Sequence, residues 1–125
     1  MSAPGTRRAR LGALALARSG DKGAHASIGV WVASDEAYAF LHLVDAEVVR
    51  LHFARLAPTR VDRHELPNLR AVNFVLHGVL GTGGGSASLR TDAQAKAYGQ
   101  ALLRLELDIP TVLLDAATRP RFQKG

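Results

Sequence analysis

The stretch ARSGDKGAHASIGV, residues 17–30, places Gly20 and Gly23 on either side of an acid and a base, between two apolar runs. The run before it, residues 11–17, has the length of a short strand, and the run IGVWVA at residues 28–33 suits a second strand. Glycines permit the backbone conformations that tight connections need. The sequence therefore predicts two strands joined by a glycine-bounded loop.

An amphipathic helix is expected next, at about residues 36–56. Ser34 and Asp35 precede it and are good N-caps. Apolar residues then recur at steps of three and four, which is typical of a helix with one buried face: Leu41, Val44, Val48 and Leu51. Pro58 ends this pattern.

The following two runs predict a hairpin with strands at residues 59–66 and 69–79. Pro67 and Asn68, which lie between them, are a turn-forming pair. The second run also suits a buried helix, because its leucines and valines recur at helical spacing as well. The sequence favours the hairpin as the simpler of the two interpretations.

A second long helix is expected to begin at Thr91, which forms a capping box with Gln94. Pro110 follows this helix, and TVLLD at residues 111–115 is interpreted as a final strand. The order βαββαβ, with a mostly antiparallel sheet and two helices packed on one face, is the ferredoxin-like α+β sandwich. We expect one such domain, over residues 11–118.

The net charge of +5 is concentrated at the two ends of the chain. We expect basic tails at residues 1–10 and 119–125, which contain no acid and six basic residues: Arg7, Arg8, Arg10, Arg119, Arg121 and Lys124. The body between them is about neutral and has one Trp and two Tyr, so that no nucleic-acid platform is expected. No run approaches the roughly 20 apolar residues of a membrane helix, and we expect a cytoplasmic protein without membrane contact.

Two glycine-rich segments are candidate anion sites. In the first, Gly20 and Gly23 let backbone N–H groups converge on a phosphate while Lys22 adds positive charge. The alternative is a plain turn, in which Asp21 bonds to backbone and Lys22 is solvated. The second, GTGGGSAS at residues 81–88, leads to a polar set: Ser86, Ser88, Arg90, Asp92 and Lys96. If the basic members of this set face the first segment, the two segments together bind a diphosphate; otherwise they form a solvated helix end.

The five histidines and the absence of cysteine argue against a metal site. Their spacing includes no paired ligand motif and no HExxH pattern, and no thiolate is available, so neither a metal nor a cofactor is expected. His25 is the exception with a candidate role, because it lies beside Asp21 and Lys22 and suits acid–base chemistry. A triad of Ser19, Asp21 and His25 is not assigned, since triads are defined by geometry.

The strings ARSGDKG, IGV, HELPNLRAVNFVLHGVLGTGGG and SLRTDAQAK, in this order, resemble the ferredoxin-fold domain of the acyclic terpene utilization (AtuA-like) family. The resemblance covers about residues 11–110. It implies a small protein that acts with a larger AtuA-type chain where branched or terpenoid acids are degraded as acyl-CoA thioesters. It also implies a candidate ligand site: Ser19, Gly20, Asp21, Lys22, Gly23, Asn73, Gly83, Gly84, Arg90, Asp92 and Lys96. The chain departs from the family pattern at Ser27, where Asn is common, and at Ala95, where Gly often precedes the lysine.

Three functions remain open. As a binding and assembly module, which we favour, the protein receives the phosphate groups of an acyl-CoA at an interface with the larger chain. As a subunit of a lyase or hydratase, it uses Asp21 or His25 to exchange a proton and Lys22 or Arg90 to stabilise an oxyanion. As a purely structural module, it binds no ligand. The edges of such a sheet also predict a homo-oligomer.

Overall fold

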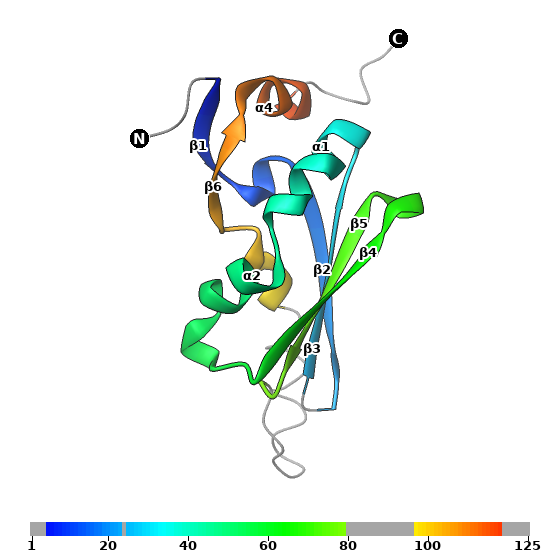
Figure 1. Cartoon of the computed structure of the whole chain (residues 1–125), viewed down its shortest axis with the longest axis vertical. Coiled ribbons are helices and arrows are strands. Elements are labelled where there is room, and N and C mark those ends of the chain that lie inside the picture. Colours follow the sequence, from blue (N-terminus) through cyan, green and yellow to red (C-terminus); the bar gives the residue numbers. More distant parts are fainter. Residues whose placement is uncertain (1–4, 24, 80–96, 119–125) are drawn as a thin grey trace.

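Antiparallel sheets with helices packed on one face of the larger sheet make this an α+β protein (Figure 1). The architecture comes from a computed structural model that describes residues 5–23, 25–79 and 97–118. The predicted fold class is confirmed, and the arrangement is consistent with a ferredoxin-like fold. Several elements nevertheless differ from the sequence prediction.

The larger sheet has four strands in the order β2-β3-β5-β4, all antiparallel to their neighbours. They are β2 (Ala15–Lys22), β3 (His25–Val32), β4 (Arg60–Leu66) and β5 (Ala71–His77). The predicted hairpin is β4 and β5, joined by a 3₁₀ turn at Pro67–Leu69. The second run of that hairpin is thus a strand, and the alternative of a buried helix is excluded.

The helix predicted at residues 36–56 is two shorter helices, α1 (Asp35–Phe40) and α2 (Ala46–His52). Asp45 separates them, because its backbone is extended and its Oδ1 accepts a hydrogen bond from the N–H of Val48 at 2.9 Å. The single-helix prediction is wrong because Asp45, which lies within the predicted range, caps the start of a new helix.

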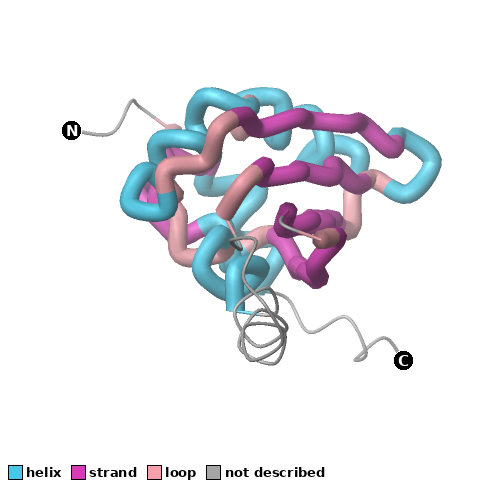
Figure 2. The backbone as a smooth tube through the Cα atoms, turned by 90° about the horizontal axis from the view of Figure 1, so that it is seen from below, coloured by secondary structure: helices cyan, strands magenta, loops and turns pink. Residues whose placement is uncertain are grey.

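Burial alternates along β3 and divides the sheet into a covered face and an open face. Its buried residues are Ala26, Ile28, Val30 and Val32, and the residues between them are only partly buried. Since successive side chains of a strand point to opposite faces, the core lies on one side of the sheet, against α1 and α2. Figure 2 shows the helices on that side, and no helix of the described residues covers the other.

The loop predicted between the first two strands is a tight hairpin turn. β2 continues to Lys22, whose register partner is His25, so that only residues 23 and 24 connect the strands. Gly23 has a φ of +65°, the left-handed conformation that favours glycine. Gly20 lies in the strand and pairs with Ser27. The prediction was wrong because a glycine on an open sheet face was interpreted as a loop residue.

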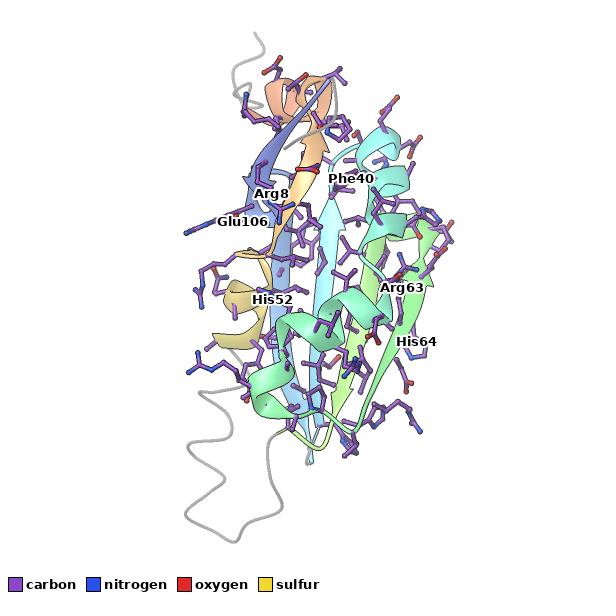
Figure 3. All side chains as sticks on the ribbon, turned by 60° about the vertical axis from the view of Figure 1, so that its left-hand side comes forward. Arg8, Phe40, His52, Arg63, His64 and Glu106 are labelled. Atoms are coloured by element: carbon purple, nitrogen blue, oxygen red, sulfur yellow. The ribbon has the colours of Figure 1, made fainter. Side chains whose placement is uncertain are left out.

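The basic segment predicted as an N-terminal tail contains a strand. β1 (Thr6–Arg10) pairs antiparallel with β6 (Glu106–Pro110), and the two form a separate sheet. Arg8 lies 3.5 Å from the carboxylate of Asp108 and 3.9 Å from that of Glu106, toward which it points in Figure 3. Arg8 and Arg10 therefore lie opposite acids that are about 100 positions away in the sequence, and a pattern of neighbouring residues does not reveal this pairing.

The segment TVLLD, predicted as the final strand, begins the helix α4 (Thr111–Thr118). The last strand is instead β6, which precedes it and does not join the four-stranded sheet. Leu114 is buried while Val112 is 69% exposed, the one-sided burial of a helix on a surface. The predicted C-terminal tail, residues 119–125, lies outside the described residues.

The second long helix is described in part. Residues 97–102 are helical, with Tyr98 and Leu102 buried in the core, and the predicted start at Thr91 lies outside the described residues. Across the part of the chain that the structure describes, no helix combines the length and the apolar character that crossing a membrane requires.

Candidate functional site

The open face of the four-stranded sheet brings together side chains from distant parts of the sequence. The strand register arranges them in rows across the sheet: Leu16, Trp31, Ala71 and Leu66; then Arg18, Gly29, Asn73 and His64; then Gly20, Ser27, Val75 and Asp62; and finally His25, His77 and Arg60. The rows change from apolar at one end to polar and charged at the other. This face combines an apolar surface with hydrogen-bonding groups, as ligand sites do.

A hollow of about 450 Å³ lies on this face, and we call it the open-face hollow. Its lining residues come from all four strands: Arg18, Ser19, Gly20, Ser27, Gly29, Trp31, Leu66, Ala71 and Asn73. Its volume lies in the range of about 300–1,000 Å³ that is usual for small-molecule sites. Three of the residues proposed from sequence, Ser19, Gly20 and Asn73, thus contribute to one hollow.

Ser27 and Asn73 form the polar centre of the open-face hollow. The hydroxyl of Ser27 donates to Oδ1 of Asn73 at 3.3 Å, between β3 and β5. Gly29 keeps the space beside them open, because a Cβ placed there would lie 3.7 Å from the same Oδ1 in ordinary contact. Ser27, noted in the sequence only as a departure from the family pattern, is therefore the partner of a predicted site residue.

Ser19 has a structural partner on the covered side of the sheet. Its Oγ accepts a hydrogen bond from the N–H of Gly99 at 2.9 Å. Gly99 packs closely on β2, since a Cβ at this position would lie 3.1 Å from that Oγ. Ser19 thus fixes helical residues 97–102 against β2, and its backbone, next to Gly20, borders the hollow.

The other predicted site residues are placed only partly or not at all. The backbones of Asp21 and Lys22 end β2, opposite Ala26 and His25, and Gly23 makes the turn. Five predicted residues lie outside the described residues: Gly83, Gly84, Arg90, Asp92 and Lys96. The convergence of the two glycine-rich segments therefore stays a prediction.

A cluster of two histidines, an aspartate and an arginine lies at the turn end of the open face. The rings of His25 and His77 are 4.5 Å apart. Nε2 of His77 lies 2.8 Å from Oδ2 of Asp62, and Arg60 donates from Nε to the other carboxylate oxygen at 3.0 Å. The hydrogen bond from His77 is the main reason that the pKa of Asp62 lies below its usual value, and Arg60 lowers it further.

The hydrogen bonds of this cluster fix its proton positions. The N–H of Gly78 donates to Nδ1 of His25 at 3.1 Å, so that the neutral ring carries its proton on Nε2. His77 donates from Nε2 to the carboxylate of Asp62, which leaves its Nδ1 as an acceptor when the ring is neutral. Sequence reasoning selected His25 and missed His77 and Asp62, because only the register of three strands brings them together.

The remaining histidines lie apart from this cluster. His52 points from α2 toward helical residues 97–102 and bonds to the carbonyl oxygen of Ala101 at 2.8 Å (Figure 3). His42 lies on the helix side, 3.5 Å from Glu65, and His64 is exposed on β4. No group of three or more metal-ligating side chains occurs among residues 5–23, 25–79 and 97–118.

Comparison with known proteins agrees with the resemblance seen in the sequence. The family model of the AtuA ferredoxin-like domain matches residues 9–108, which include the whole four-stranded sheet and the open-face hollow. Searches among curated proteins and among solved structures gave no match. On the extent of the family match, the chain belongs to the AtuA ferredoxin-like domain family.

Proposed function

We propose that this protein is a small subunit that acts with a larger AtuA-type chain in the cytoplasmic catabolism of branched or terpenoid acyl-CoA compounds. In this role it binds and positions the acyl-CoA on the open face of its sheet, at the boundary between the chains. The observation that carries the proposal is the open-face hollow, which joins Asn73 and Gly20 with a basic rim residue, Arg18. Membership of the family supports the acyl-CoA context.

The form of the hollow supports a site shared between chains. An acyl-CoA is larger than a hollow of about 450 Å³, so that much of the ligand lies beyond it. In the apolar row at one end of the face, Leu16 is 61% exposed and Leu66 is 41% exposed. Exposed apolar groups beside a polar hollow are typical of surfaces that another chain covers. That second chain is the larger partner in our proposal, and a homo-oligomer is formed through other surfaces.

Substitution of Gly29 provides the sharpest test. A β-branched side chain suits a strand, and a Cβ at this position makes only ordinary contacts, so that Gly29→Val fills the hollow without disturbing the fold. Calorimetry with isovaleryl-CoA should show a dissociation constant raised about tenfold or more in Gly29→Val and in Arg18→Ala. Equal affinity in the wild type and both variants contradicts the proposal.

The partner is tested separately. The tagged chain is expressed in its native host, purified under mild conditions, and the proteins that accompany it are identified by mass spectrometry. We expect a larger AtuA-type chain that is lost from the Gly29→Val sample. Recovery of the same partner with both forms would place the interface elsewhere, and recovery of the chain only with copies of itself would favour a purely structural module.

A second candidate, acid–base chemistry in a lyase or hydratase, is favoured by the contact between His25 and the His77–Asp62 pair. Nε2–H of neutral His25 can donate a hydrogen bond to a reacting oxygen, and Asp62 orients His77 as a base through Nδ1. If either is used, His25→Gln or His77→Gln should lower the turnover of the assembled complex by about 10²-fold or more. Unchanged turnover in both variants removes this candidate, and Asp21→Asn tests the other base proposed from sequence.

A further inference from the structure

A second cavity lies on the helix side of the molecule, away from the open face. It has a volume of about 540 Å³ and lies between the end of α2, with the 3₁₀ turn at Ala54–Leu56, and helical residues 97–102. His52, which bonds to the carbonyl oxygen of Ala101, ties these two elements together at one wall. We call this space the arginine-rimmed cavity, and none of its lining residues belongs to the open-face hollow.

The walls of the arginine-rimmed cavity are apolar and partly aromatic. Phe53 and Tyr98 lie with ring centroids 5.9 Å apart at a tilt of 58°, and Leu56 and Ala101 complete the apolar lining. Both aromatic residues are buried in the core, which fixes the rings in position. A rigid aromatic wall favours an apolar ligand body of one ring or a short branched chain.

The rim of the cavity carries two positive charges that no acid neutralises within the described residues. Arg55 lies in the 3₁₀ turn at Ala54–Leu56, and Arg104 lies in the turn that follows helical residues 97–102. Both are exposed and form no ion pair with any described residue. Among residues 5–23, 25–79 and 97–118, no acidic residue lines the cavity. Arg50, one turn earlier on α2, is by contrast paired with Glu47. A guanidinium matches the geometry of a carboxylate, so that the charge of this site is complementary to an organic carboxylate.

From this combination we propose that the arginine-rimmed cavity binds a small organic carboxylate with an aromatic or branched apolar body. The apolar body lies against Phe53 and Tyr98, and the carboxylate accepts hydrogen bonds from Arg55 and Arg104. The site holds one free acid of this kind, independently of the acyl-CoA site proposed on the open face.

The test uses 3-phenylpropanoate as the probe and the full chain as the protein. Calorimetry and NMR titration should show saturable binding at one site, with affinity lowered about tenfold or more in Arg55→Ala and in Arg104→Ala. Arg50→Ala is the matched control, because it removes an arginine of the same region that does not line the cavity. The neutral 3-phenylpropanamide should bind at least about tenfold more weakly than the acid.

The emission of Trp31 and the oligomeric state of the variants are two further readouts that decide the outcome. Trp31, the only tryptophan, lines the open-face hollow, so that 3-phenylpropanoate should leave its emission unchanged while an acyl-CoA changes it. Failure of this proposal is thereby distinguished from failure of the proposed function. No saturable binding, equal binding of acid and amide, or equal affinity in all variants would overturn it. So would dimerisation that either arginine variant abolishes, because a second copy would then occupy the cavity.

Discussion

Nε2 of His77 and Oδ2 of Asp62 meet at 2.8 Å across β5 and β4, with the ring of His25 against the same imidazole. The pair lies at one end of the face that carries the open-face hollow. It links a titratable carboxylate to a hydrogen bond that joins two strands of that face.

The stability that Asp62 contributes should be lost at acid pH. The hydrogen bond from His77 lowers the folded-state pKa of Asp62 below its usual 3.8, so that its contribution is complete above this value and is lost as the pH falls through the lowered pKa. Carboxyl NMR titration should therefore place Asp62 below 3.8, and His77→Gln should raise that pKa. A titration of Asp62 that is the same in both proteins contradicts the pairing.

Two glycines of the SGDKG segment should respond oppositely to alanine. Gly23→Ala should lower the free energy of unfolding by about 1 kcal/mol, because alanine is strained at positive φ. Gly20→Ala should leave it unchanged or raise it by up to about 0.5 kcal/mol, since Gly20 is in a strand and a Cβ there meets nothing within 4 Å. Urea denaturation measures both, and equal losses would mean that the segment is a loop after all.

Removal of the first strand should destabilise the fold. Deletion of residues 1–10 removes the partner of β6 and uncovers Ile109, which is fully buried, at a cost of about 2 kcal/mol or more. Deletion of residues 1–4 is the control, because β1 begins at Thr6. Thermal denaturation should separate the two deletions clearly. The same melting temperature for both would show that the strand contributes nothing.

The cap between the two helices should be measurable by itself. Asp45→Ala should lower the free energy of unfolding by about 1 kcal/mol, because the N–H of Val48 loses its acceptor. Asp45→Ser, which keeps a capping oxygen, should recover most of this loss. If alanine and serine are equivalent at this position, the break between α1 and α2 does not depend on the cap.

Local patterns in the sequence predicted the elements whose contacts are local. The hairpin of β4 and β5 follows from Pro67 and Asn68, and the N-cap of α1 is Ser34, whose Oγ accepts from the N–H of Ala37 at 3.1 Å. The β1–β6 pair was missed because an arginine-rich segment becomes a strand only through a partner about 100 residues away. TVLLD was assigned to the wrong class because a run of three aliphatic residues, Val112, Leu113 and Leu114, suits either structure.

In the candidate site, too, some residues could be selected from local sequence patterns, and others are brought in only by contacts between distant strands. Gly20 and Asn73 were selected from sequence and both line the open-face hollow, while Ser19 was selected with them and binds Gly99 on the covered side. Trp31 and His77 were missed as site residues. Their places depend on strand register, since a shift of one residue moves a side chain to the other face. Residue type identified candidates, and register decided which of them share a surface.

Titration with isovaleryl-CoA, followed by the fluorescence of Trp31, shows whether the open face of the sheet is the ligand-binding surface. For the wild-type chain with its larger partner we expect a saturable change in emission, and for Gly29→Val we expect loss of that change with the fold intact by circular dichroism. Emission that does not respond in the wild type, or that responds identically in Gly29→Val, would contradict that role of the open face.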